Sequence, residues 1–170
     1  MFYFDLGDLI MRFENLSYDN KIKFLQRMHR KLNKYLFNGE LSEVFIDISN
    51  INKNYDENEK AFAIYHSRGY FQARDLYDKS VILLSLEALE KIEKYKTQDK
   101  QKEFIAYLIG HEMIHQYCDE NGIDDWNHSK EWQIEAHKRG ILDTYDDEGK
   151  STKLEYSVIL SFLVMDMRIR

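Results

Sequence analysis

The sequence predicts an α+β domain in which a small sheet of three or four strands packs against helices, and three patterns support this. Apolar residues recur at helical spacing over 25–36, alternate with polar residues over 44–48, and run continuously over 81–84. A second helical stripe over 104–109 leads directly into the pattern His-Glu-Met-Ile-His. That motif is therefore expected on a helix spanning about 99–118.

The composition indicates one globular domain over residues 1–170. Of these 170 residues, 44% are hydrophobic and 14% aromatic, which is enough for a sizeable core. No apolar run reaches the roughly 18 residues of a membrane span, and Asp5 and Asp8 are unlike a signal peptide. A cytoplasmic protein with no membrane partner is expected. The single cysteine, Cys118, excludes an internal disulfide framework and a CxxC zinc ribbon.

The net charge of −6 argues against a protein that coats nucleic acid by charge alone. The first predicted helix nevertheless has a basic face over residues 21–34, formed by Lys21, Lys23, Arg27, Arg30, Lys31 and Lys34. This face either contacts nucleic acid or an acidic partner, or is a solvated helix face, as charge runs usually are. Asp19 can cap this helix and Asn38-Gly39 ends it. Residues 1–16 before it fit a short helix or an extended arm.

Strands are predicted for the middle of the chain. Val44, Ile46 and Ile48 share one face of a strand, and the polar segment 49–60 follows as a loop. Two β-like runs, 61–66 and 69–74, flank a turn. The apolar run over 80–84 is typical of an interior strand, after which Ser85 can cap a helix to about residue 95.

The motif His111-Glu112-Met113-Ile114-His115 carries the chemistry. On a helix its two histidines lie one turn apart on the same face, with Glu112 beside them. Two such imidazoles form half of a Zn²⁺ site, and a third protein ligand would leave one position open for water. Glu112 would then act as the general base towards that water.

His128 is the expected third ligand. It is predicted in the first turn of a helix that begins at Asn127 or Ser129 and ends at Gly140, with Trp132 packed beneath it. The competing ligands are the Cys118 thiolate, one turn beyond His115, and three acidic side chains, Asp119, Glu120 and Glu131. Cys118 is more readily explained as a buried small hydrophobe. His66 and His137 are expected to be structural or exposed, because neither has a ligand spacing.

After the metal motif, residues 141–152 are predicted to form an acidic loop, followed by an apolar element over 154–169. Apolar residues alternate there as in a strand, yet Thr152-x-x-Glu155 resembles a capping box. A helix is favoured. It is too short to span a bilayer and is expected to pack on the core or on a second subunit.

The sequence HEMIHQY, an acidic glycine-containing loop and then His128-Ser129-Lys130-Glu131-Trp132 resemble the SprT-like zinc metallopeptidases. The upstream stretches over 36–41 and 82–85 also resemble that family, so the likeness covers about residues 20–140. It implies a zincin-like fold with HExxH on a central helix and one zinc per chain. It also implies His111, His115 and His128 as zinc ligands and Glu112 as the catalytic base. Asn127 and Ser129 stand where family members often have glycine, and this chain has no C-terminal cysteine ribbon.

The sequence therefore predicts a zinc metalloendopeptidase of bacterial or phage type whose protein substrate lies extended along a sheet edge. The alternative is a non-catalytic zinc-binding interaction module, possibly associated with nucleic acid through the basic helix over 21–34. The sequence does not specify the oligomeric state or the oxyanion-stabilising residue.

Overall fold

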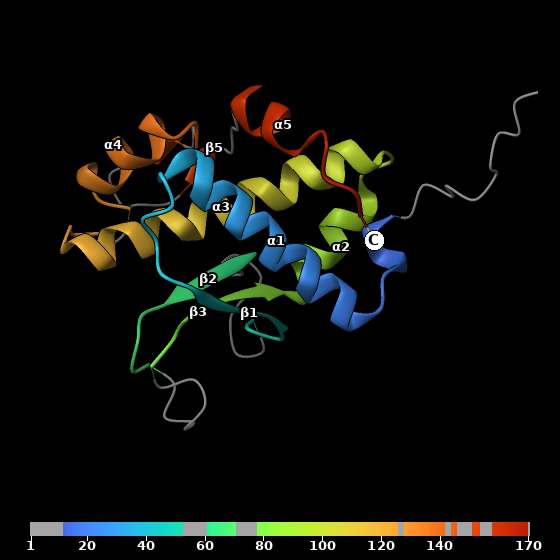
Figure 1. Cartoon of the computed structure of the whole chain (residues 1–170), viewed down its shortest axis with the longest axis horizontal. Coiled ribbons are helices and arrows are strands. Elements are labelled where there is room, and N and C mark those ends of the chain that lie inside the picture. The colour runs from blue at the N-terminus through green and yellow to red at the C-terminus, as the bar shows by residue number, and fades with distance from the viewer. Residues whose placement is uncertain are drawn as a thin grey trace, which may run out of the picture.

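The computed structural model describes residues 12–52, 61–70, 78–125, 128–141, 144–145, 151–153 and 158–169. Figure 1 shows their arrangement. The elements are, in order, η1 (Phe13–Asn15), α1 (Tyr18–Leu36), β1 (Val44–Ser49), β2 (Ala63–His66), β3 (Ser80–Ser85), α2 (Leu86–Lys94), α3 (Gln98–Asn121), α4 (Lys130–Lys138), β4 (Thr144–Tyr145), β5 (Ser151–Lys153) and α5 (Val158–Val164). The predicted mixed α+β class is confirmed. Within the described ranges, no helix is both long enough and apolar enough to cross a membrane.

The main sheet has three strands in the order β1-β3-β2. β1 runs parallel to β3, with Val44 opposite Ser80, whereas β2 runs antiparallel to it, with Ala63 opposite Leu84. β3 is central and buried at every position except Leu83, which explains its continuous apolar run. β2 therefore forms one edge of this sheet. Most of the second β-like run, over 71–74, lies outside the described residues.

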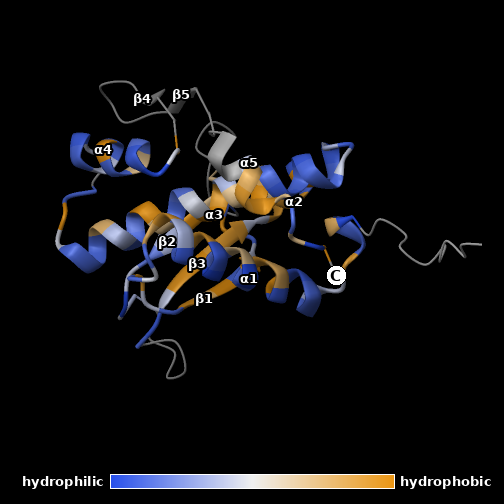
Figure 2. Cartoon of the chain, turned by 45° about the horizontal axis from the view of Figure 1, so that its top comes forward, coloured by the Kyte–Doolittle hydropathy of each residue, from blue (hydrophilic) through white to orange (hydrophobic). Residues whose placement is uncertain are grey.

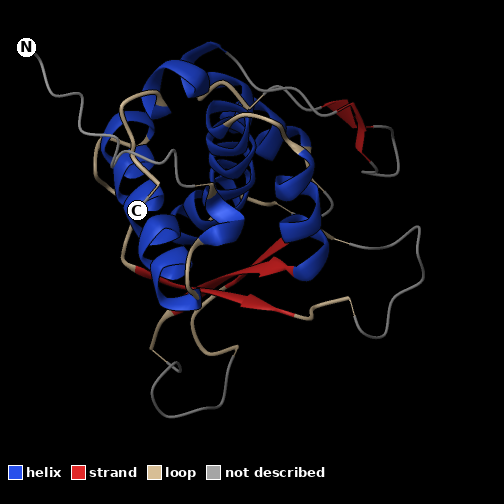
Figure 3. Cartoon of the chain, turned by 90° about the vertical axis from the view of Figure 1, so that its right-hand side faces the viewer, coloured by secondary structure: helices blue, strands red, loops and turns tan. Residues whose placement is uncertain are grey.

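The helices gather on one face of the sheet, as Figure 3 shows. The core lies where α1, α3 and that face meet, and Figure 2 shows the apolar residues concentrated there. Its fully buried members include Leu25 and Met28 from α1, Ile109 from α3, and Ile46 and Ile82 from the sheet. Burying each such side chain contributes roughly 1.5–3 kcal/mol. α3 is buried around much of its circumference and so holds the HEMIH motif rigidly against the sheet.

Helix caps agree with the sequence in part. Ser85 caps α2, accepting from the backbone N–H of Ala88 at 3.0 Å, as predicted. Ser17 rather than the predicted Asp19 caps α1, and Thr97, two residues before Asp99, caps α3. These hydroxyl residues precede each helix with extended or near-extended backbone, whereas the two aspartates lie in the first turn, where the helix dipole favours their charge.

The C-terminal segment is helical over Val158–Val164, as favoured, but the predicted capping box is wrong. Thr152 belongs to β5, which pairs antiparallel with β4, so it does not start the helix. The segment packs on the core, as predicted. Val164 and Ile169 are buried, and the carbonyl of Met165 accepts a hydrogen bond from the Lys102 ammonium at 3.1 Å.

Part of the basic face of α1 makes contacts within the chain. Lys21 donates to the carbonyls of Glu14 and Leu16, and Arg27 donates to the carbonyl of Arg168. Lys31 forms an ion pair with Asp166. Half of the six cations of this face thus bind the chain itself, so contact with nucleic acid through the rest stays a prediction.

Candidate metal centre

Three imidazoles converge at one side of α3. His111 and His115 project from consecutive turns of the helix, and His128 approaches them from the loop before α4. Nε2 of His128 lies 3.1 Å from Nε2 of His111 and 3.3 Å from Nε2 of His115. Among the described residues, these three form the one group of His, Cys, Asp and Glu side chains with metal-ligand spacing, their ligand atoms lying within 4.8 Å of one another. This cluster can hold a metal ion.

The prediction that His128 lies in the first turn of α4 is wrong. His128 precedes the helix. Ser129 is the N-cap, and its Oγ accepts from the backbone N–H of Trp132 at 3.1 Å. His128 has a positive φ of 55°, an unusual conformation for a residue other than glycine. A hydrogen bond from Gln133 Nε2 to the His128 carbonyl, 2.8 Å long, holds this conformation. The turn directs the imidazole back towards α3.

Trp132 forms the apolar floor of the cluster, as the sequence predicted. It is 1% exposed, and its ring lies with centroids 4.8 Å from His111, 5.2 Å from His115 and 4.6 Å from His128. One rigid indole therefore contacts all three imidazoles. This packing restricts the rotation of the rings and excludes water from that side of the cluster.

Glu112 lies beside the imidazoles and is buried, with 5% of its surface exposed. Burial raises the pKa of its carboxyl group, while the nearby His111 and a backbone hydrogen bond from Tyr65 act in the opposite direction. A hollow of about 270 Å³ opens beside this carboxylate and is lined by Ala63, Ile64, Tyr65, Glu112, His115, Asp125 and His128. Strand β2 thus forms one wall of the hollow, and Glu112, Asp125 and two of the candidate ligands, His115 and His128, form the other.

Asp125 is a site residue that the sequence analysis missed. Its Oδ2 lies 2.9 Å from Nδ1 of His115, and this hydrogen bond is the main cause that lowers the pKa of the Asp125 carboxyl group. The sequence signal that could have identified Asp125 is its position in an acidic stretch between two candidate ligands, His115 and His128. That stretch contains several acids, and local spacing does not say which of them reaches a histidine.

The four side chains that competed with His128 as the third ligand lie outside the histidine cluster. Cys118 is fully buried, and burial raises the pKa of its thiol to about 12, so it is a neutral core residue. Asp119 accepts from the Tyr65 hydroxyl at 2.7 Å, and Glu120 accepts from Gln116 at 2.8 Å. Glu131 is exposed on α4. None of these four belongs to the described metal-ligand group.

Comparison with protein-family models, curated proteins and solved structures finds no match for this chain. The resemblance to SprT-like metallopeptidases therefore stays a prediction from the motifs.

Another side of α3 is fixed by a second polar network that the sequence did not reveal. Gln116 Nε2 donates to the carbonyl of Ser42 at 2.9 Å and to Glu120 at 2.8 Å, so its amide oxygen faces His29 Nε2 at 3.1 Å. Because an amide oxygen only accepts, the neutral His29 ring carries its proton on Nε2. Burial lowers the pKa of His29 and favours this neutral form. The network ties α3 to α1 and to the residues before β1.

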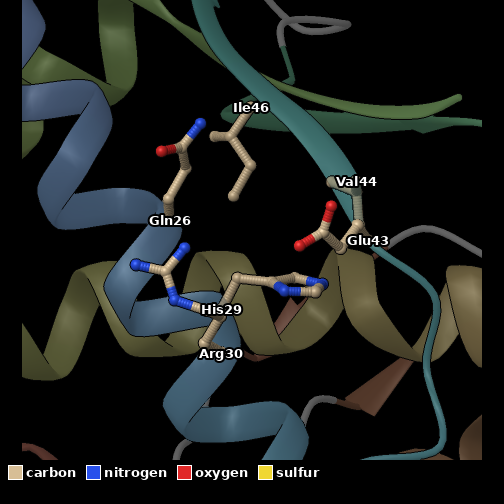
Figure 4. Close-up of a pocket in the computed structure, with 6 residues that line it drawn as sticks. All are labelled: Gln26, His29, Arg30, Glu43, Val44 and Ile46. Carbon is tan, nitrogen blue, oxygen red and sulfur yellow. The ribbon is translucent and has the colours of Figure 1, made fainter.

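Figure 4 shows His29 in the hollow between α1 and β1, which has a volume of about 250 Å³ and is also lined by Gln26, Arg30, Glu43, Val44 and Ile46. Since His29 is bonded to the residue after His115, this network sets the rotation of α3 about its axis. The rotation decides which side of α3 faces β2 and His128.

Proposed function

We propose that this chain is a zinc-dependent metalloendopeptidase with a zincin-like, SprT-like site. One observation carries the proposal. The Nε2 atoms of three histidines converge next to a buried glutamate, and the hollow lined by that glutamate and by two of the histidines, His115 and His128, is bounded by an edge strand. The same residues were expected from the HEMIH motif and the following histidine.

His111, His115 and His128 would hold the zinc ion through their Nε2 atoms. The donor set fits zinc, because neutral imidazole is one of its preferred ligands, and three protein ligands are typical of catalytic rather than structural sites. When bound, the ion supplies a Lewis acid that polarises the scissile carbonyl and makes a nearby water more acidic.

Glu112 acts as the proton carrier. Its burial raises the carboxyl pKa, so the carboxylate is a stronger base than an exposed glutamate. It accepts a proton from the attacking water and passes it to the leaving amine. The backbone hydrogen bond from Tyr65 fixes the carboxylate towards β2, where the substrate would lie.

The substrate would lie extended along β2. The backbone N–H of Ser85 donates to the carbonyl of Phe62 at 2.8 Å, so, by the alternation of an antiparallel ladder, Ile64 and His66 bond to β3. The backbone groups of Ala63 and Tyr65 consequently point away from β3, towards the hollow. The Tyr65 N–H already donates to Glu112, so a substrate would pair with the N–H and C=O of Ala63 and the C=O of Tyr65. It would be held by its main chain, with little preference for sequence.

Replacing Glu112 by Gln tests this proposal. We expect the Glu112→Gln variant to keep its zinc, measured by elemental analysis, but to cleave denatured casein about 10²–10⁴-fold more slowly. Glu131→Gln, an equivalent change on the exposed face of α4, is the matched control and should cleave at the parent rate.

Equal cleavage by Glu112→Gln and the parent would refute the role of Glu112. A parent that binds one zinc tightly but cleaves no peptide bond would favour the non-catalytic zinc-binding module instead. In that case zinc removal would be expected to unfold the chain.

A further inference from the structure

We propose that Asp125 is the positioning residue of the metal centre, fixing the tautomer of His115 and the approach of His128 together. This inference rests on the metal site of the proposed function. It adds a residue that is neither a ligand nor the base. It does not depend on whether the chain cleaves peptides.

Asp125 contacts two of the three candidate ligands through different groups. Its carboxylate Oδ2 lies 2.9 Å from Nδ1 of His115, on helix α3. Its backbone carbonyl accepts a hydrogen bond from the N–H of His128 at 3.1 Å. A single residue therefore links the helix that carries two ligands to the turn that carries the third.

The carboxylate contact decides which nitrogen of His115 can bind a metal. An ionised carboxylate only accepts hydrogen bonds, so the shared proton lies on Nδ1 of His115. The lone pair is then on Nε2, the atom that lies 3.3 Å from Nε2 of His128. A carboxylate on the far nitrogen of a ligating histidine also orients the ring and raises its basicity.

The neighbouring residue strengthens the same turn. The carbonyl of Asp124 accepts a hydrogen bond of 2.5 Å from the hydroxyl of Ser129, the residue that caps α4. Successive carbonyls at 124 and 125 thus hold the start of α4 and His128. This explains how His128 keeps its left-handed backbone in a loop that contains no glycine next to it.

The contribution of Asp125 should come from orientation more than from charge alone. The side chains of His115 and Asp125 are 17% and 38% exposed, so solvent screens their charge interaction. Removing the hydrogen bond frees the imidazole to rotate and to place its proton on Nε2 for part of the time, and in that form Nε2 cannot bind a metal. Both effects act on metal affinity and on ligand geometry.

Zinc affinity of the full chain, measured by competition with a chelator at fixed neutral pH, tests the assignment. We expect Asp125→Asn, which can still accept from Nδ1, to weaken zinc binding about tenfold, and Asp125→Ala to weaken it about 100-fold. Asp124→Asn removes the same charge one residue away but keeps both carbonyls, and should stay within about twofold of the parent. Cobalt(II) replaces zinc in a second measurement, where the visible absorption of Asp125→Ala should differ from that of the parent.

Zinc affinity within about twofold of the parent in Asp125→Ala, with an unchanged cobalt spectrum, would overturn the role of Asp125. If Asp125→Ala fails to fold, the zinc affinity of Asp125→Asn tests the role instead, because asparagine keeps the size of the side chain. An affinity equal to that of the parent would then overturn the role of Asp125. Absence of zinc binding in the folded parent would overturn this inference together with the three-histidine site. A graded loss of zinc affinity in a chain without peptidase activity would refute the proposed function alone.

Discussion

Gly110, the residue before His111, allows α3 to approach the chain that follows α4. A Cβ atom added there would lie 3.0 Å from Cδ1 of Ile141 and 3.9 Å from Cδ1 of Leu32. Ile141 is fully buried, so its terminal methyl group has little room to move. We therefore expect Gly110→Ala to create an overlap next to the metal site.

Two opposing effects set the magnitude. Alanine in a helix interior is favoured over glycine by about 0.8–1.0 kcal/mol, whereas overpacking a core costs about 1–3 kcal/mol. Gly110→Ala should therefore lower the free energy of unfolding by about 1 kcal/mol, the net of these effects. Ile141→Val removes the methyl group that would be struck and costs about 0.5–1.5 kcal/mol by itself. In the double variant the alanine methyl group can use that space, giving a favourable coupling of about 1 kcal/mol.

Urea unfolding of the metal-free parent, both single variants and the double variant supplies the four free energies of the cycle. The single variant Ile141→Val serves as the control for the loss of one methyl group. A rise of about 1 kcal/mol in the free energy of unfolding of Gly110→Ala, the full helix gain, would refute the expected overlap with Ile141. A coupling energy below about 0.3 kcal/mol would refute it equally, since independent sites give such values.

Two further predictions concern the metal and the pH. Chelation should lower the melting temperature of the zinc-supplied parent much more than that of His128→Ala, which lacks one ligand. A ligand at 100 times its Kd stabilises the folded chain by about 2.7 kcal/mol, and this stabilisation is lost when the metal is removed. Equal shifts in the melting temperatures of the two proteins would contradict a three-histidine site. Burial lowers the pKa of His29 from its ordinary 6.5, so below that pH the unfolded chain takes up a proton that the folded chain does not. The free energy of unfolding of the metal-free parent, measured with urea, should therefore fall more between pH 7 and pH 5 than that of His29→Gln. Identical pH profiles of the two proteins would show that His29 is not buried in its neutral form.

Much of the fold could be read from local patterns. The alternation of Val44, Ile46 and Ile48 identifies β1, and these residues do contact the core. The end of α3 was predicted less closely, at about residue 118, whereas the helix continues to Asn121, where Gly122 ends it with a left-handed backbone and φ 65°. Prediction failed where two local signals competed, as between Ser17 and Asp19 at the start of α1. A hydroxyl and a carboxylate both favour a helix N-terminus, and only the backbone conformation distinguishes cap from first turn.

The α+β class and the identities of the candidate ligands follow from local sequence patterns. Residues four apart on a helix share a face whatever surrounds them, so HEMIH places His111 beside His115 without any tertiary information. The tertiary structure alone decided which acid reaches His115, how His128 turns back to the cluster, and that Glu112 is buried beside β2. These features depend on how distant elements pack and how the loop before α4 closes, and residue spacing along the chain does not encode those distances.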